Sequence, residues 1–239
     1  MDMEAILTEA QRIADMESPD AGARYLAPHR KEACLKLHDD ITHLGALLRI
    51  VCLQMHFLTQ AGYADKARDI AGWFLHLFHH LESEVPKDAF IALKRMYRES
   101  FSLFYYRYAE ALRDLDEVEG MRLSLRTALD LTQQREAVIV AALHLLQPFV
   151  AFESLEGESA ANWLSKRLAE FLAQLDFAGK SDSAFRSALD AFQYCFRQRN
   201  QDDVFPKAKS DFESLVQDCA DDPEMQGLRA VAKLWFCHK

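Results

Sequence analysis

Hydrophobic residues recur at every third or fourth position along most of the chain, which is the period of an amphipathic α-helix. No segment shows the strict alternation of a half-buried strand. The 239 residues include only eight glycines and six prolines, few for the turns of an all-β fold. The pattern therefore predicts an all-α protein of about ten helices. Because the connections are short, we expect sequential helices to pack antiparallel.

Breaks in the periodicity set the limits of the predicted helices. The stretch MESPDAGARYLAP is expected to be a connector after a short first helix, and Pro148 is expected to end or kink a later helix because proline lacks an amide proton. Asp222 is a candidate cap for the last helix. The predicted helices are 3–16, 29–60, 64–83, 88–114, 118–132, 135 to about 148, one containing Trp163 to Leu175, 183–199, 205–219 and 223–237.

The longest predicted helix, 29–60, has the clearest apolar stripe. Its inward positions are expected to be Leu37, Ile41, Leu44, Leu48, Val51, Met55 and Leu58.

Charge and targeting features narrow the class of partner. The formal net charge is −9, which repels nucleic acid and anionic membranes. The first residues, MDMEAILTEA, lack the basic start of a signal peptide, and the most apolar run falls short of the ~20 residues that span a bilayer. The five cysteines form no CxxC pair, so reduced thiols are expected rather than disulfides or zinc. We expect a soluble, cytoplasmic protein.

Two segments each predict a helix, a tight turn and a second helix: VCLQMHFLTQAGYADKARDIAGWF and YYRYAEALRDLDEVEGMRLSLRTALDL. Both resemble a tetratricopeptide repeat, and together they cover about 70–80 residues. Met121 is larger than the family's small residue, and Gln133 stands where a proline usually closes the repeat. Ala71 and Phe74 exchange the expected sizes. The positions that carry the resemblance are Leu58, Gly62 and Ala67 in the first segment and Tyr105, Tyr108, Ala109, Leu112, Met121, Leu125 and Ala128 in the second.

The resemblance implies stacked antiparallel helical hairpins, a tetratricopeptide-like α-solenoid, with a compact bundle as the alternative all-α architecture. One domain is expected over 1–239, consisting of an N-terminal helix and connector (1–28), the repeat-like hairpins (29–133) and further helical hairpins (134–239).

It also implies a non-enzymatic scaffold that binds a protein or peptide on a concave surface built from the first helix of each pair. The family's groove positions fall here on Arg49, His56, Tyr106, Glu110 and Arg113. Positions 38, 49 and 56 are separated by whole helical turns, so His38, Arg49 and His56 are expected to share a face of the helix 29–60. The alternative is that these residues only cover a helix edge or satisfy internal hydrogen bonds.

The stretch LHDDITHLGALL offers a chemical alternative. It resembles the phosphoacceptor segment of one histidine-kinase subfamily, which implies a phosphorelay component with His38 as acceptor and Asp39 as its helper. No Gly-rich ATP-binding segment follows it. The structural alternative is an amphipathic helix with Asp39 and His43 paired one turn apart.

A histidine cluster in HLFHHLE offers a second alternative. His76 and His80, with His79 between them, have the spacing of metal ligands on a helix, but Leu77 stands where a catalytic zincin has glutamate. We expect neither metal nor another cofactor. A small-molecule-binding bundle would require an enclosed pocket.

The basic, aromatic stretch KRMYRESFSLFYYRY has its rings at helical spacing, so most of them are expected in the core rather than on nucleic acid. A protein or peptide is the expected partner, neither nucleic acid nor membrane, and homo-oligomerisation is left open.

Overall fold

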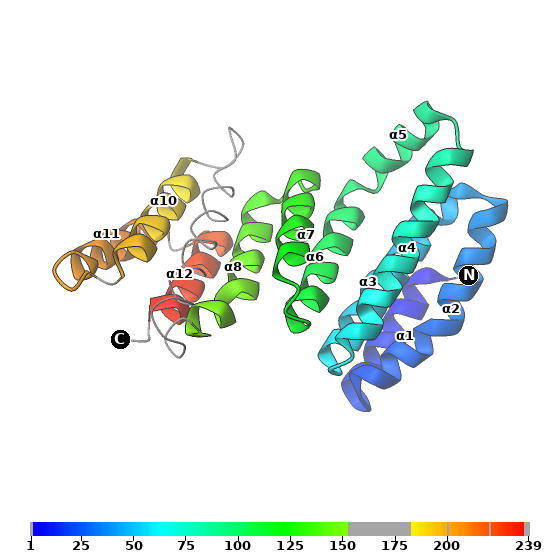
Figure 1. The fold of residues 1–239 in the computed structure, drawn as a ribbon, viewed down its shortest axis with the longest axis horizontal. Coiled ribbons are helices and arrows are strands. Elements are labelled where there is room, and N and C mark those ends of the chain that lie inside the picture. The colour runs from blue at the N-terminus through cyan, green and yellow to red at the C-terminus, as the bar shows by residue number, and fades with distance from the viewer. Residues whose placement is uncertain (1, 153–182, 200, 220, 237–239) are drawn as a thin grey trace. The chain divides into compact units, whose positions relative to one another are not determined.

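The computed structural model describes residues 2–152, 183–199, 201–219 and 221–236. These residues form eleven α-helices and one short 3₁₀ helix and no strand, which confirms the all-α class (Figure 1). The predicted helix containing Trp163 lies outside the described residues. The helices are α1 (Met3–Met16), α2 (Pro19–Asp39), α3 (Leu44–Gln60), α4 (Ala64–Glu84), α5 (Lys87–Met96), α6 (Arg98–Asp114), α7 (Val118–Leu131), α8 (Arg135–Phe152), α10 (Ser183–Gln198), α11 (Phe205–Gln217) and α12 (Pro223–Phe236).

The contacts divide the chain into two compact units, an N-terminal unit (residues 1–133) and a C-terminal unit (residues 134–239). The division falls between the segments 29–133 and 134–239 of the sequence analysis.

The predicted start of the second helix is wrong. Residues 17–28 are not a connector, because α2 begins at Pro19. The Ser18 hydroxyl caps it by accepting a hydrogen bond from the Ala21 N–H (3.1 Å), and proline is well suited to a first turn, where its missing N–H costs nothing. Gly22 is buried within α2, where an added Cβ would lie 2.9 Å from both Ala14 and Phe57, so the glycine permits close packing on α1 and α3.

The single helix predicted over 29–60 is also wrong. α2 ends at Asp39, and Asp40 is extended (φ −150°, ψ 113°) before the 3₁₀ turn Ile41–His43 and α3. The Asp40 carboxylate accepts a hydrogen bond from the Thr42 N–H (2.9 Å), a local contact that competes with helix continuation. The expected apolar stripe is nevertheless buried, apart from half-buried Ile41.

Two later predictions also differ from the structure. The helix predicted over 88–114 is divided at Tyr97, whose hydroxyl donates a hydrogen bond to the Thr42 carbonyl (3.2 Å). α8 continues past Pro148 to Phe152, so of the two outcomes predicted for this proline, an end or a kink, the end is wrong. Asp222 does cap α12, because its Oδ1 accepts from the Met225 N–H (2.9 Å).

The turns between α3 and α4 and between α6 and α7 have the same hydrogen-bond pattern. In the first, Gly62 N–H donates to Thr59 O (3.0 Å) and Tyr63 N–H to Leu58 O (2.8 Å). In the second, the corresponding bonds join Asp116 N–H to Arg113 O (3.0 Å) and Glu117 N–H to Leu112 O (2.9 Å). Gly62 (φ 79°) and Asp116 (φ 57°) both adopt the left-handed conformation of a Schellman motif.

The core of the N-terminal unit is centred on α3, which packs against α1, α2, α4 and α6. α6 in turn packs against α4 and α7 (Figure 1). Aromatic rings fill the space between α4 and α6, with centroid distances of 4.9 Å for Phe74–Phe104 and 4.7 Å for Phe78–Phe101. Such large rings supply much of the apolar area that a helical core buries.

The C-terminal unit has a smaller aromatic core. The Phe192 ring on α10 lies 5.1 Å from Trp235 and 6.0 Å from Phe212, so it contacts both α12 and α11. The Trp235 indole N–H donates to the Leu143 carbonyl (3.1 Å), which fixes α12 against α8.

In the part of the chain that the structure describes, one segment, Ile41–Gln60, is long and apolar enough to cross a membrane by length and composition, with a mean hydropathy of 1.4, so the expectation that the most apolar run is too short is wrong. Within the N-terminal unit 61% of its window is buried by neighbouring helices. A core helix of a soluble protein satisfies the same criterion, so this segment is weak evidence for a membrane.

Candidate functional site

The five residues predicted to line a binding surface lie on α3 and α6, and the structure brings two of them together across the helix interface. His56 Nδ1 on α3 lies 3.8 Å from Glu110 Oε2 on α6. Arg107, one turn before Glu110, donates hydrogen bonds to both carboxylate oxygens (3.0 and 2.8 Å). Its guanidinium also lies 5.7 Å from the centre of the Tyr106 ring. We call His56, Tyr106, Arg107 and Glu110 the α3–α6 polar cluster.

The electrostatics of this cluster reflect its partial burial. Burial raises the pKa of Glu110, but the interaction with His56 and the positive charge of Arg107 outweigh it, so the pKa lies below its usual range. Burial, followed by the charge of Glu110, raises the pKa of Tyr106 to about 12. At neutral pH the cluster therefore holds a carboxylate that is charged and paired, beside a phenol that is neutral.

The two predicted arginines are paired elsewhere. Arg49 Nη1 on α3 donates to Glu4 Oε1 on α1 (2.7 Å), and Arg113 forms an ion pair with its neighbour Asp114 (2.7 Å). Both pairs are partly exposed, and exposed pairs contribute little to stability. The expected shared face of His38, Arg49 and His56 is wrong, because that geometry required one helix and His38 lies on α2.

The histidines considered for chemistry lie on the surface. His38 is exposed in the last turn of α2, and the proposed Asp39–His43 pair is not spaced along one helix, since α2 ends at Asp39. His79 and His80 pair with Glu82 (3.4 Å) and Glu84 (3.2 Å). Among the described residues, no three His, Cys, Asp or Glu side chains are grouped as metal ligands.

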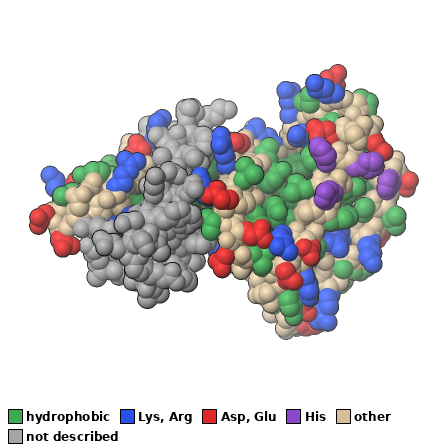
Figure 2. All heavy atoms as spheres, viewed as in Figure 1, with side chains coloured by type: hydrophobic (Ala, Val, Ile, Leu, Met, Phe, Trp, Pro, Cys, Tyr) green, Lys and Arg blue, Asp and Glu red, His purple; other side chains and the backbone are tan. Residues whose placement is uncertain are grey.

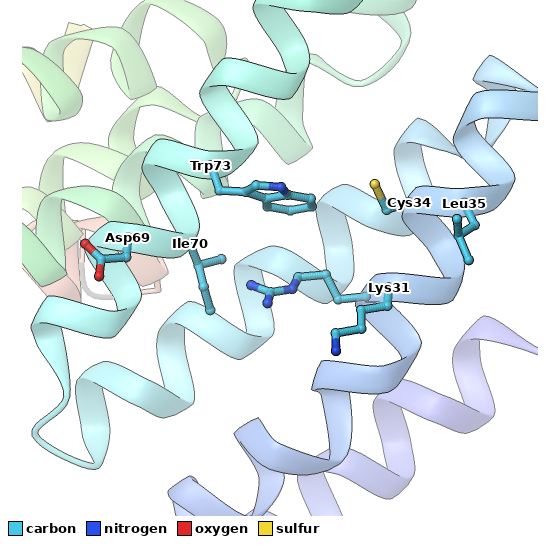
Figure 3. Close-up of a pocket in the computed structure, with 7 residues that line it drawn as sticks. Lys31, Cys34, Leu35, Asp69, Ile70 and Trp73 are labelled. Atoms are coloured by element: carbon cyan, nitrogen blue, oxygen red, sulfur yellow. The ribbon is translucent and has the colours of Figure 1, made fainter.

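Sequence reasoning missed a groove between α2 and α4. It has two adjoining hollows with volumes of about 620 and 440 Å³, which share Asp69 and Ile70. Figure 2 shows hydrophobic side chains and histidines exposed on this side of the N-terminal unit. In Figure 3 the Trp73 indole extends from α4 toward Cys34 on α2. We call this surface the α2–α4 groove; its lining residues used below are Asp20, Arg24, Arg30, Lys31, Leu35, Tyr63, Lys66, Asp69, Ile70 and Trp73.

The signal for the groove was present in the sequence but weak. Leu35 and Trp73 are large apolar residues that remain 68% and 37% exposed, and each stands apart from the buried stripe of its helix. Exposed apolar residues gain meaning only when they adjoin. Their proximity depends on α2 and α4 both packing on α3, which the periodicity alone does not specify.

Comparisons of this chain with protein families, with curated proteins and with solved structures find no match. The fold itself defines the class: an all-α protein, in the described residues, with paired helices in its N-terminal unit.

Proposed function

We propose that this protein is a non-enzymatic scaffold of the tetratricopeptide-like type, which binds another protein or a peptide on its N-terminal unit. The helices α1–α2, α3–α4 and α6–α7 would be successive hairpins of a stack, with α1, α3 and α6 as the first helices. Solenoids of this kind expose a continuous surface built from equivalent helices, which suits binding of an extended partner.

The observation that supports the stack best is the equivalence of the α3–α4 and α6–α7 pairs. Gly62 and Asp116, the left-handed residues of the two turns, are separated by 54 positions. The same separation relates His56 to Glu110, so equivalent positions of adjacent first helices face one another. This is the contact expected when one structural unit is repeated by translation along a stack.

The proposed binding surface comprises the exposed parts of α1, α3 and α6 near Arg49 and Arg113. These arginines are suitable reporters because each is partly exposed and its ion pair is on the surface. His56 and Glu110 are less suitable, since changing them would also disturb packing between α3 and α6.

The test is quantitative capture from a native lysate with the wild-type chain and an Arg49→Glu/Arg113→Glu variant. The matched control is Lys87→Glu/Arg126→Glu, which makes the same change in charge at exposed sites on α5 and α7. A partner retained by wild type and control but lost from the first variant is expected. A partner whose capture is lost equally from both variants, or retained by both, would contradict binding at this surface.

The phosphorelay role of His38 remains the alternative prediction. Its exposure satisfies one requirement of a phosphoacceptor, but His76, His79 and His80 are exposed too. No observation favours this role over the scaffold.

A further inference from the structure

The α2–α4 groove has the dimensions of a short helix. Its lining residues run from Asp20 to Leu35 on α2 and from Tyr63, the residue before α4, to Trp73 on α4. At 1.5 Å per residue these stretches measure about 22 and 15 Å, the length of roughly three to four helical turns. Both walls repeat at steps of three or four residues, so they present evenly spaced side chains to an occupant.

The walls of this groove are α-helices, and this limits the backbone conformation of an occupant. Helical N–H and C=O groups are already paired within each helix, so the groove offers no backbone partners to an extended strand. A peptide that binds as a helix forms hydrogen bonds between its own backbone N–H and C=O groups, so it needs only side-chain contacts with the groove. Binding of an amphipathic helix in an apolar groove is a general mode of peptide recognition.

Charge indicates which helices would fit. The Arg30 guanidinium lies 5.1 Å from the centre of the Trp73 ring, and no carboxylate pairs with it among the described residues. Burial lowers the pKa of Arg30, which reflects the cost of partly desolvating its charge. A guanidinium that stacks through its face keeps its in-plane N–H donors for a planar, bidentate acceptor such as a carboxylate.

The other charges around the groove agree with this preference. Lys31 adjoins Arg30, and Lys66 lies 3.9 Å from the centre of the Tyr63 ring. The groove's acidic residues already have cationic partners, since Asp69 pairs with Arg68 (3.6 Å) and Asp20 with Arg24 (3.2 Å). A chain with a net charge of −9 thus has a groove in which Arg30, Lys31 and Lys66 have no carboxylate partner in the described part of the chain.

We propose that the α2–α4 groove binds an acidic amphipathic helix of a partner protein. About three turns of that helix would place apolar side chains on Ile70, Trp73 and Leu35, with carboxylates beside Arg30 and Lys31. This inference rests on the proposed scaffold function but concerns a different surface, formed by α2 and α4 and distinct from the one tested through Arg49 and Arg113.

The experiment is a selection from a displayed library of 16-residue peptides with leucines fixed at helical spacing and all other positions randomised. The bait is the full 239-residue chain. Enriched peptides are expected to carry Asp or Glu beside the leucine stripe. Circular dichroism should show that they become helical on binding.

Variants then locate the site. Arg30→Gln and Trp73→Ala should each weaken binding about 10-fold or more, since a charged hydrogen bond and an aromatic anchor are lost. The exposed control Arg126→Gln should change affinity by less than about twofold. Matched thermal unfolding of all three variants must first show that the fold is retained, and Lys31→Gln provides a second reporter, at an exposed position, if Trp73→Ala unfolds.

Several outcomes would overturn the acidic-helix proposal, and they can be told apart from a failure of the scaffold function. Enrichment of basic or uncharged peptides, no enrichment, or equal binding by wild type and Arg30→Gln would overturn this proposal. Peptides lost only by Arg49→Glu/Arg113→Glu would overturn it while supporting the scaffold function. Arg30-dependent binding of a fluorescent single-stranded oligonucleotide, without peptide binding, would identify the groove as a phosphate site and overturn the acidic-helix proposal.

Discussion

The α3–α4 and α6–α7 pairs share a turn but distribute their core volume differently. Along α4 the buried positions facing the core are Ala67, Ala71 and Phe74, in the order small, small, large. The equivalent buried positions of α7, 54 residues later, are Met121, Leu125 and Ala128, in the order large, large, small. The turn geometry is therefore compatible with either arrangement, because it depends on backbone hydrogen bonds, whereas the volume depends on the neighbouring helices.

The largest expected effect comes from removing the bulky side chain of the α3–α4 pair. Phe74→Ala would make α4 resemble α7 at this position, where the equivalent residue is Ala128. The Phe74 ring is fully buried and lies 4.9 Å from Phe104, so its loss leaves a cavity between α4 and α6. We expect the free energy of unfolding to fall by about 3–5 kcal/mol.

Urea unfolding followed by circular dichroism measures this loss, and hydrogen exchange in α4 and α6 assigns it to the N-terminal unit. Leu123→Ala on α7 is the control, because Leu123 is 67% exposed and its truncation should change stability by less than about 0.5 kcal/mol. Equal losses for Phe74→Ala and Leu123→Ala would contradict the unequal distribution of volume.

The contact of Glu110 with His56 and Arg107, which joins the two hairpins, is tested by Glu110→Gln. The change keeps the shape of the side chain but removes the charge that holds Arg107 and His56. Because the pKa of Glu110 is lower in the folded protein than in an unfolded chain, its contribution to stability is present above the unfolded pKa. It is lost as the pH falls through the folded pKa. We expect Glu110→Gln to cost about 2 kcal/mol at pH 7 and progressively less below pH ~4.

Unfolding measured from pH 7 to pH 3 checks this dependence. Asp130→Asn, at an exposed position on α7, removes one carboxylate without disturbing the cluster and provides the control. A Glu110→Gln difference that is constant across this range would show that the carboxylate is not stabilised by its neighbours.

The fold was predicted from the sequence where local signals decide it. The ends of α3 and α4 around Gly62 followed from the turn residues, and the buried stripes followed from helical periodicity. The break at Asp40 was missed because apolar residues continue at Leu37, Ile41 and Leu44 with unchanged spacing. The hydrogen bond from the Thr42 N–H to the Asp40 carboxylate competes with helix continuation. In the sequence, however, Asp40 cannot be distinguished from an exposed aspartate on an unbroken helix.

The candidate sites depend more on tertiary contacts. His56 and Glu110 were selected through the family resemblance, and the structure then placed them together. Arg107 precedes Glu110 by three positions in the predicted helix 88–114, a spacing that allows the two side chains to pair, but the resemblance did not select Arg107. Arg30 and Trp73 are 43 positions apart, and their stacking exists only because α2 and α4 pack on the same helix.

The shared left-handed turn residue gives a smaller prediction. Gly62→Ala adds a Cβ that meets no atom within 4 Å, so any cost is conformational rather than steric crowding by neighbours. At φ 79° that cost should be about 1–2 kcal/mol. The control is Gly72→Ala on α4, where an added Cβ also meets nothing but the backbone is helical. The free energy of unfolding of Gly72→Ala should rise by about 0.5–1 kcal/mol. A rise for both variants would show that the turn does not need glycine.

The smallest effect is expected from making the second turn resemble the first. Asp116 has the left-handed conformation at φ 57°, which aspartate tolerates better than most residues and glycine adopts without steric cost. Asp116→Gly should raise the free energy of unfolding by about 0.5 kcal/mol. Glycine removes the steric cost of the left-handed conformation, but its greater freedom in the unfolded chain offsets part of that gain. Asp116→Ala should lower it, because alanine has neither glycine's freedom nor aspartate's local hydrogen bonding. If Asp116→Gly instead destabilises the protein as much as Asp116→Ala, the carboxylate itself stabilises this turn, and the two hairpins reach the same backbone geometry by different means.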